Sequence, residues 1–482
     1  MTVNKKEFVR EYVKAIRAGT AVVFAGAGLS RGSGYVDWKE LLRPLAEDIG
    51  LDVDKEKDYL KIAQFYQNMR GGTRGSINQA IVTAFTQNVR QNENIQILAR
   101  LPISTYWTTN YDSLLESALR EANRKPDVKS EAEQLAVIVP DRDAVVYKMH
   151  GDVLNPAHAV LTKRDYEMYD YHRPMFRTAL KGDLIAKTFL FIGFSFEDPN
   201  LDYILGEIRA ILNENIHDHY CFFKKVQRKD YGNGENADKE YGYDLAKQDM
   251  QIENLKQYGI QTILVDQFDE ITEILRKVEE SCKMNEVFIS GSADVYPDPW
   301  NKEQSQVLVR ELAAALVKRN YRITSGFGLG IGSWVINSAL DVVYREKNRH
   351  TDRYLRLRPF PQNITDPDER KQLWTKYRQD MISDVGVAIF LFGNKKSPKN
   401  EVELNPINAT GCMEEFEIAR SSGKYIIPIG STGFAAKEIY DKVKEDIKRY
   451  PYLKEYMDLL GTETDVTKIV EAVLTILEKI KV

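Results

Sequence analysis

Three segments of the sequence place polar side chains directly after apolar runs of strand length. Thr20–Ser30 reads T-A-V-V-F-A-G-A-G-L-S, Asn110 and Asp112 follow Ile103–Thr108, and His150 follows A-V-V-Y-K-M. An asparagine can hold a water molecule or a hydroxyl group, and a histidine with its ordinary pKa near ~6.5 can accept a proton at neutral pH. Because ligands bind beyond the carboxyl ends of strands in an open α/β sheet, we predict that these side chains share one crevice.

The turn that contains Gly26 and Gly28 is suited to a phosphate-bearing ligand. Small residues let such a ligand approach the backbone, and free N–H groups in a turn attract anions. A purely structural turn is the alternative, because a strand followed by G-x-G and a helix is common. In the same way, Asn110 and Asp112 could cap a helix expected over Tyr111–Ala122, and a lone histidine is more often structural than catalytic.

Apolar runs alternate with amphipathic stretches around these residues. This alternation predicts a doubly wound α/β domain over residues 1–283. The charged segment Val226–Asp249 is expected to be exposed. Arg70 and Arg74 lie in a glycine-rich link, where we favour a solvated loop over contact with a phosphate. The buried strands are expected at Ala21–Ala25, Ile103–Thr108, Ala144–Asp152, Thr188–Ile192, His219–Lys224 and Gln261–Val265.

A second α/β domain is expected over residues 284–482. Its strand near Tyr321–Ser325 leads into G-F-G-L-G-I-G-S before a helix. Glycines at alternate positions in that context favour an anion cradle over a flexible linker. Arginine and lysine there would supply positive charge for phosphates, with solvated surface charges as the alternative. The residues expected at this nucleotide site are Gly291, Ser292, Gly328, Gly330, Arg378, Lys395, Gly411 and Glu415.

Composition excludes several classes of function. The 482 residues carry a net charge of -4, which gives no sign of a nucleic-acid surface, and no apolar run is long enough to cross a bilayer. The 3 cysteines lie far apart, which suits a reducing cytosol and predicts no zinc site. The first residues lack the apolar core of a signal peptide, so we expect a cytoplasmic protein.

The ordered motifs of the first half resemble the sirtuin family, which binds NAD. These motifs are G-A-G-x-S after a strand, then T-x-N-x-D, H-G and G-F-S. The resemblance implies that NAD contacts Ala25, Gly26, Gly28, Ser30, Asp112 and Ser195, and that Asn110 and His150 act catalytically at the nicotinamide ribose. The glutamine that precedes the asparagine in sirtuin deacylases is Thr109 here, and their zinc module is missing. The pattern is therefore more similar to the bacterial sirtuin-like NAD hydrolases of antiphage defence.

The second half resembles the SLOG superfamily of nucleotide-binding, Rossmann-like domains. Its LOG phosphoribohydrolases carry R-x-x-M and then G-G-x-G-T-x-x-E. Here Arg378 and Met381 match the first motif, but only Gly411 and Glu415 match the second. The resemblance therefore implies nucleotide binding without turnover. Phosphoribohydrolase activity is the alternative.

A sirtuin-like domain followed by a SLOG domain is similar to the effectors of the Thoeris antiphage system. The resemblance implies an NAD hydrolase without a metal, activated when a cyclic ADP-ribose isomer binds the SLOG domain. It further implies that a TIR-domain partner enzyme makes the isomer and that the effector is a homo-oligomer, expected to be a tetramer. A protein deacylase and a non-catalytic nucleotide sensor are the alternatives.

Overall fold

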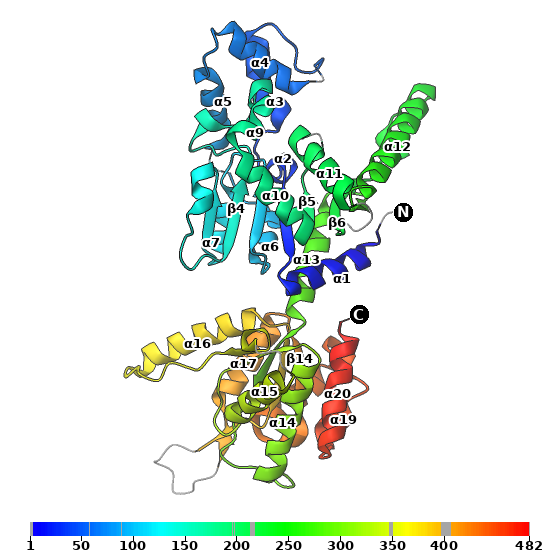
Figure 1. The fold of residues 1–482 in the computed structure, drawn as a ribbon. Helices are drawn as coiled ribbons and strands as arrows, with labels where there is room; N and C mark the ends of the chain where they lie inside the picture. The colour runs from blue at the N-terminus through cyan, green and yellow to red at the C-terminus, as the bar shows by residue number, and fades with distance from the viewer. Residues whose placement is uncertain are drawn as a thin grey trace. The chain divides into compact units, whose positions relative to one another are not determined.

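The chain folds into two α/β units, each built on a parallel sheet. The computed structural model describes residues 3–56, 58–87, 89–194, 196, 198–212, 217–346, 350–396 and 406–481. Its contacts divide the chain into Met1–Glu279 and Glu280–Val482, called here unit 1 and unit 2 (Figure 1). Two units with parallel sheets confirm the predicted fold class.

Unit 1 contains a 7-stranded sheet in the order β3-β4-β2-β1-β5-β6-β7. Its neighbouring strands all run parallel. A parallel sheet is covered on both faces, so its central strands are largely apolar, and every residue of β1 is buried. The strands are β1 (Ala21–Ala25), β2 (Thr105–Thr108), β3 (Pro126–Lys129), β4 (Ala144–Lys148), β5 (Thr188–Ile192), β6 (His219–Lys224) and β7 (Ile260–Val265).

Helices cover both faces of this sheet. Val22 and Phe24 of β1 share a core cluster with residues of α10 and α11, whereas Tyr12 of α1 donates its hydroxyl to the carbonyl of Val22. The helices are α1 (Lys5–Ala18), α2 (Ala27–Arg31), α3 (Trp38–Asp48), α4 (Tyr59–Met69), α5 (Gly75–Phe85), α6 (Glu93–Arg100), α7 (Leu114–Glu121), α8 (Lys163–Glu167), α9 (Tyr169–His172), α10 (Pro174–Ala186), α11 (Pro199–Leu212), α12 (Glu235–Lys256) and α13 (Asp269–Lys283).

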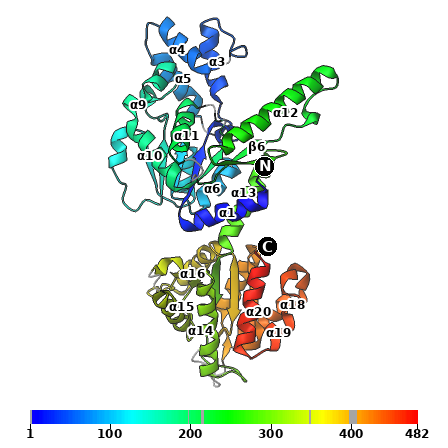
Figure 2. The same cartoon turned by 45° about the vertical axis from the view of Figure 1, so that its right-hand side comes forward.

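Two elements of unit 1 differ from what the sequence pattern predicts. The edge strand β3 was not expected, because P-D-V-K is short and polar. The exposed charged segment is largely the helix α12, which extends away from the sheet in both views (Figures 1 and 2). Only its C-terminal half buries residues, namely Gln248, Ile252 and Leu255. Because so few residues of this long helix are buried, its sequence shows only a weak helical periodicity of apolar residues. The sequence pattern therefore did not predict the helix.

Helices α3, α4 and α5 form a group of their own, called here the helical module (residues 38–85). Helix α3 contacts both α4 and α5, and the three helices gather beyond the end of the sheet that carries α2 (Figure 1). Asp37 caps α3, since its side chain accepts a hydrogen bond from the Glu40 N–H. The module therefore has its own start signal and its own internal packing.

Unit 2 contains a 5-stranded parallel sheet in the order β10-β9-β8-β11-β14 and a short antiparallel pair, β12 and β13. Helix α14 packs against α15 and α20, and α17 packs against α16 and α18. The strands are β8 (Glu286–Ser290), β9 (Arg322–Ser325), β10 (Leu355–Leu357), β11 (Val387–Leu391), β12 (Asn394–Lys395), β13 (Ile407–Asn408) and β14 (Tyr425–Ile429). The helices are α14 (Lys302–Lys318), α15 (Gly332–Arg345), α16 (Pro367–Ser383), α17 (Thr410–Ser421), α18 (Phe434–Glu445), α19 (Met457–Thr462) and α20 (Val466–Lys479).

Candidate functional site

The register of the large sheet brings the predicted catalytic segments to one edge. Ala25 at the end of β1 pairs with Thr108 on one side and with Ile192 on the other. Thr108 in turn pairs with Lys148 at the end of β4. Because the strands are parallel and in step, the loops that follow β1, β2, β4 and β5 all leave the sheet at the same edge.

The glycines after β1 serve a close contact between two of these loops. The expected tight turn is the start of α2, with Gly26 as its N-cap. A Cβ on Gly26 would lie 2.4 Å from the Gly193 carbonyl oxygen, and one on Gly193 would lie 2.1 Å from the Leu29 nitrogen. Gly28 is held against Gly193 as well. The structure thus gives these glycines a structural role in addition to any contact with a ligand.

Asn110, Ser30 and Asp112 form a directed hydrogen-bond network. Asn110 Nδ2 donates to Ser30 Oγ at 2.8 Å and to the Gly26 carbonyl at 3.0 Å. Ser30 Oγ donates to Asp112 Oδ2 at 2.7 Å. Both amide hydrogens of Asn110 are therefore used, and within the described residues no donor reaches its Oδ1. That oxygen is the atom of Asn110 available to a substrate hydroxyl or water.

Asp112 also contacts the helix that follows it, which is the alternative role expected for this side chain. Its Oδ1 accepts from the Leu114 N–H at 3.0 Å, at the start of α7. The side chain is buried, which raises its pKa, while its hydrogen bonds from Leu114 and Ser30 act in the opposite direction. Asp112 therefore contacts the first residue of α7 and orients Ser30, and its contact with NAD stays a prediction.

A buried lysine that the sequence analysis did not single out supports this loop. Lys148 is fully buried, and its Nζ donates to the carbonyls of Tyr111 at 3.0 Å and Asp112 at 2.6 Å. It also lies 2.6 Å from Asp152 and 3.1 Å from Glu116. Burial lowers the pKa of Lys148, but the carboxylates outweigh that effect and raise it overall. A lysine inside a buried strand, two residues before His150, is the sequence signal for this role.

His150 occupies a buried aromatic pocket beyond β4. It is 1% exposed, and Trp38, Tyr166 and Tyr169 surround its ring at centroid distances of 6.4, 5.4 and 6.5 Å. Its Nε2 lies 3.0 Å from Asp198 Oδ2. Apart from this ion-pair contact, neither ring nitrogen has a hydrogen-bond partner among the described residues. An unsatisfied buried imidazole is costly, which is typical of a functional position.

A small cavity adjoins the network. Its volume is about 10 Å³, which is room for about one water molecule. Its polar lining includes Ser30, Thr108, Asn110, Asp112 and Glu116. Ser195, predicted to contact the adenosine side of NAD, lies outside the described residues. The ring of Trp38 borders the predicted catalytic histidine.

The structure gathers the predicted signal-binding residues at one edge of the smaller sheet. The loops after β8 and β9 touch, since a Cβ on Gly328 would lie 1.9 Å from the Gly291 carbonyl oxygen and one on Gly330 would lie 2.2 Å from that of Ala293. Ser292 Oγ donates to the Asn394 carbonyl at 3.0 Å, which brings in β12. Close backbone packing therefore accounts for two of the alternating glycines without a bound anion.

Arg378 reaches this edge from α16 and is almost entirely buried. It forms ion pairs with Glu414 at 2.8 Å and Glu415 at 3.3 Å, and its guanidinium lies 4.8 Å from the ring centroid of Phe360. A Cβ on Gly411 would lie 2.7 Å from Arg378 Nη2. Lys395 stands beside this group, with its Nζ donating to Thr410 Oγ1 at 3.2 Å.

The buried carboxylate beside Arg378 has an altered acidity. Burial raises the pKa of Glu415, against the effects of Ser290 Oγ, which donates to it at 2.6 Å, and of Arg378. The eight residues predicted for this site come from five segments: the loops after β8 and β9 carry Gly291, Ser292, Gly328 and Gly330, β12 carries Lys395, α16 carries Arg378, and α17 carries Gly411 and Glu415. The charge of Arg378 is balanced by two glutamates.

Comparison with known proteins relates both units to named families. Residues 104–263 match the SIR2-like domain, and residues 270–480 match the Sir2- and TIR-associating SLOG family. The NAD(+) hydrolase ThsA of Bacillus cereus (strain MSX-D12) is 44% identical over 98% of this chain and 98% of its own length. The NAD(+) hydrolase ThsA of Cytobacillus dafuensis is 43% identical over 96% of this chain and 93% of its own.

A third relative matches only part of the chain. Defense-associated sirtuin 2 of Bacillus subtilis is 29% identical over 44% of this chain and 22% of its own length. The ThsA relatives, in contrast, align from the sirtuin-like unit through the SLOG unit. Identity of this level over nearly the full chain means that the protein belongs to the ThsA NAD(+) hydrolase family.

Proposed function

We propose that unit 1 hydrolyses NAD(+) to nicotinamide and ADP-ribose. The observation that carries this proposal is that two polar groups follow strands ending at the same sheet edge: an Asn110 Oδ1 that no described donor reaches, and a buried His150 that lacks hydrogen-bond partners among the described residues. The names of the full-length relatives support the same reaction. The chain is in this view an N-glycosyl hydrolase with NAD as its substrate.

The reaction requires the protein mainly to position the ribose and a water molecule. The bond between nicotinamide and ribose has a cationic leaving group, so it breaks toward an oxocarbenium-like state, and water then bonds to the ribose carbon and releases one proton. Asn110 Oδ1 would hold that water or a ribose hydroxyl, and His150 would accept the proton. Gly26, Gly28 and Ser30 would face the pyrophosphate and ribose. Trp38 and Tyr166 border His150 and would help to exclude other nucleophiles.

Activation by a nucleotide signal is the second part of the proposal. Unit 2 would bind a cyclic ADP-ribose isomer made by a TIR-domain enzyme, and the printed description of its family, Sir2- and TIR-associating, supports such a partner. The positively charged Arg378 and Lys395 would contact the phosphates. Uncontrolled NAD loss would kill the cell, so the resting enzyme must be mostly inactive. We further propose cytoplasmic action in antiphage defence by a homo-oligomer, a tetramer.

The test is nicotinamide release from NAD by the full-length protein, with and without cyclic ADP-ribose isomers. Asn110→Ala and His150→Ala should each abolish release while an isomer still binds, since neither residue lies in unit 2. The exposed His217 offers a matched control, and His217→Ala should retain activity. Turnover in either active-site variant would remove its assigned role. Release without any isomer would keep the hydrolase and reject the switch.

The rival functions give different outcomes in the same assays. A protein deacylase would release nicotinamide only when an acylated peptide is present. A nucleotide sensor would bind an isomer and release nothing. Phosphoribohydrolase activity in unit 2 would liberate free base from a nucleoside monophosphate.

A further inference from the structure

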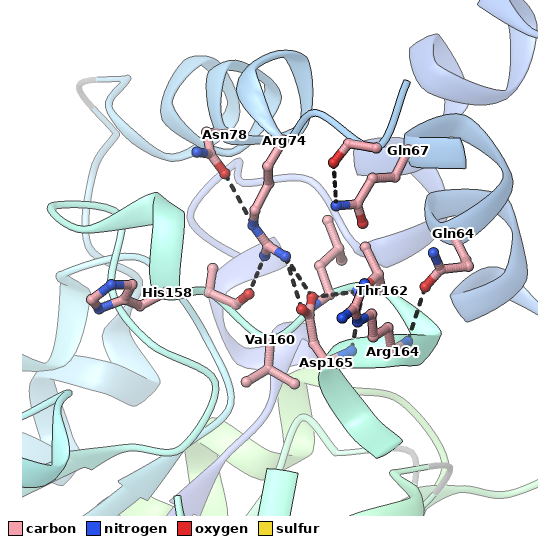
Figure 3. Close-up of polar contacts among 12 residues, drawn as sticks. Gln64, Gln67, Arg74, Asn78, His158, Val160, Thr162, Arg164 and Asp165 are labelled. Carbon is pink, nitrogen blue, oxygen red and sulfur yellow. Dashed lines mark hydrogen bonds and ion pairs between the residues drawn. The ribbon is translucent and has the colours of Figure 1, made fainter. Parts of the chain in front are cut away.

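Arg74 does not have the solvated position that its glycine-rich surroundings predict. It directly precedes α5, and its side chain is 17% exposed. Figure 3 shows the guanidinium directed away from the helical module, toward the chain segment that follows His150. Neither the solvated loop nor a phosphate contact describes it. Its partners are groups of the protein itself.

The guanidinium joins three separate parts of unit 1. Its Nη1 lies 2.9 and 2.8 Å from the two carboxylate oxygens of Asp165 on α8. Its Nη2 donates to the carbonyl of Ala159, and its Nε donates to Asn78 Oδ1 at 3.2 Å within α5. An arginine can make such a forked set of charge-assisted bonds, whereas a lysine offers only a point charge.

Asp165 organises the segment on the other side of this contact. Its Oδ2 accepts from the N–H groups of Leu161 at 3.0 Å and Thr162 at 2.8 Å, and Thr162 caps α8 in return (Figure 3). A second hydrogen bond joins the same two parts, because the Arg164 N–H donates to Gln64 Oε1 of α4 at 3.0 Å. The helical module is thus fastened to residues 159–165 at two points.

The fastened segment lies directly against the candidate catalytic histidine. The Val160 N–H donates to the His150 carbonyl at 2.8 Å, and the Tyr111 hydroxyl donates to the Val160 carbonyl at 2.7 Å. The module contributes Trp38 to the pocket of His150, and α8 contributes Tyr166, with their rings 6.1 Å apart. Arg74 and Asp165 therefore join the two elements whose aromatic side chains enclose His150.

We propose that Arg74 and Asp165 form a clamp that positions the helical module over His150 before NAD arrives. The inference rests on the proposed role of His150, and it treats both residues as positioning residues that do not touch the reacting atoms. Without the clamp, the module would sample arrangements in which the pocket around His150 is open. NAD binding would then have to restore the closed arrangement, at a cost in apparent affinity.

Enzyme kinetics separate this role from a merely structural one. If the competent arrangement is about one tenth populated in Arg74→Gln, KM for NAD rises about tenfold, while kcat at saturation stays within about twofold. Arg74→Lys should lie between the parent and Arg74→Gln, because an ammonium cannot bind Asp165 and Ala159 in the same fork. Loss of folded protein would instead lower kcat and leave KM unchanged, and that result would overturn the proposal, as would an unchanged KM.

A double-mutant cycle and a matched control complete the experiment. Asp165→Asn should raise KM similarly, and the double variant with Arg74→Gln should add less than about twofold more, because both changes break one contact. Arg43 is the control: it pairs with Glu40 and Asp54 inside the module, so Arg43→Gln should leave KM unaltered. Additive effects in the cycle would contradict a shared clamp.

Hydrogen exchange gives a readout that needs no turnover. Amides of residues 59–85 and 159–167 should exchange faster in Arg74→Gln, while those of the central strands should not change. His150→Ala tests the catalytic assignment separately. If that variant retained activity, the assignment would fail, but exchange and KM would still report whether the clamp holds the module.

Discussion

At the scale of single residues, the candidate site depends on which polar atoms the fold already uses. Asn110 donates its two amide hydrogens to the Gly26 carbonyl and to Ser30 Oγ, which leaves its Oδ1 for a ligand. Lys148 Nζ donates hydrogen bonds to two backbone carbonyls of the same loop. A buried cation in this position is stable only because Asp152 and Glu116 lie beside it. The loop geometry therefore depends on the buried charge of Lys148.

Replacement of Lys148 tests that dependence. Lys148→Met leaves buried carboxylates without their cation, so we expect unit 1 to lose about 3–5 kcal/mol of unfolding free energy. Hydrogen exchange of the β2 and β4 amides along a urea titration measures the loss. Lys61, which pairs with Asp58 at the surface, is the control, and Lys61→Met should cost at most about 1 kcal/mol. Equal effects in the two variants would contradict a special role for Lys148.

At the scale of elements, the sheet of unit 1 contains a histidine that must stay neutral. His219 begins β6 and is 1% exposed, and its Nδ1 accepts the Phe189 N–H of the neighbouring strand at 3.2 Å. Burial, with a smaller contribution from His217, lowers its pKa to about 3. The β5–β6 pairing therefore relies on an uncharged imidazole ring at His219.

This depressed pKa predicts how stability depends on pH. Below the ordinary histidine pKa near 6.5, the unfolded chain binds a proton at this position and the folded chain does not, so acid favours unfolding. The stabilisation is present above pH 6.5 and is lost as the pH falls toward 3. Between pH 7 and pH 5, His219 should remove about 2 kcal/mol of unfolding free energy. Urea unfolding of unit 1 at both pH values measures this loss.

The histidine contribution is isolated by comparing two variants. His219→Asn keeps an acceptor for the Phe189 N–H but cannot titrate in this range. Its loss of unfolding free energy between pH 7 and pH 5 should therefore be smaller than that of the parent by about 2 kcal/mol. His217→Asn removes an exposed histidine nearby and should keep the parent slope. A parent-like slope in His219→Asn would assign the pH dependence to other groups.

At the scale of the whole molecule, a SIR2-like unit is followed by a unit of the Sir2- and TIR-associating SLOG family. In the described part of the chain, no helix has the length and apolar character needed to span a membrane. Nor do the described residues include a cluster of three or more potential metal ligands. A ligand of unit 2 can activate unit 1 only through a difference in its affinity for the two states. Moving the population from ~1:99 to ~99:1 requires ~5.5 kcal/mol of such difference.

Lys395 offers a cleaner test of signal binding than Arg378. Removal of Arg378 would leave the buried Glu415 unpaired, whereas Lys395 bonds only to the Thr410 hydroxyl among the described residues. Lys395→Ala should abolish activation by the cyclic ADP-ribose isomer and leave the melting temperature unchanged. Lys396, its exposed neighbour, is the control, and Lys396→Ala should respond as the parent does. A normal response of Lys395→Ala would place the signal elsewhere.

The sequence by itself determined the fold class, the order of the two units and the strand ends after which the candidate site residues lie. Runs such as Ala21–Ala25 are apolar because both faces of a parallel sheet are buried, and this leaves a clear pattern. The polar residues after each run were therefore predictable, including Asn110 and His150. Their shared edge followed from the rule for open sheets.

Only the tertiary structure decided which partners those side chains have. Arg74 meets Asp165 across 91 residues of sequence, and Ser30 meets Asp112 across 82. No local pattern encodes such pairs, because they depend on how helices pack against loops from distant parts of the chain. The same limit hid the roles of Lys148 and Trp38 and the contact that demands Gly26 and Gly193. Spacing along the chain locates candidate chemistry, but long-range packing decides which atoms are left free to perform it.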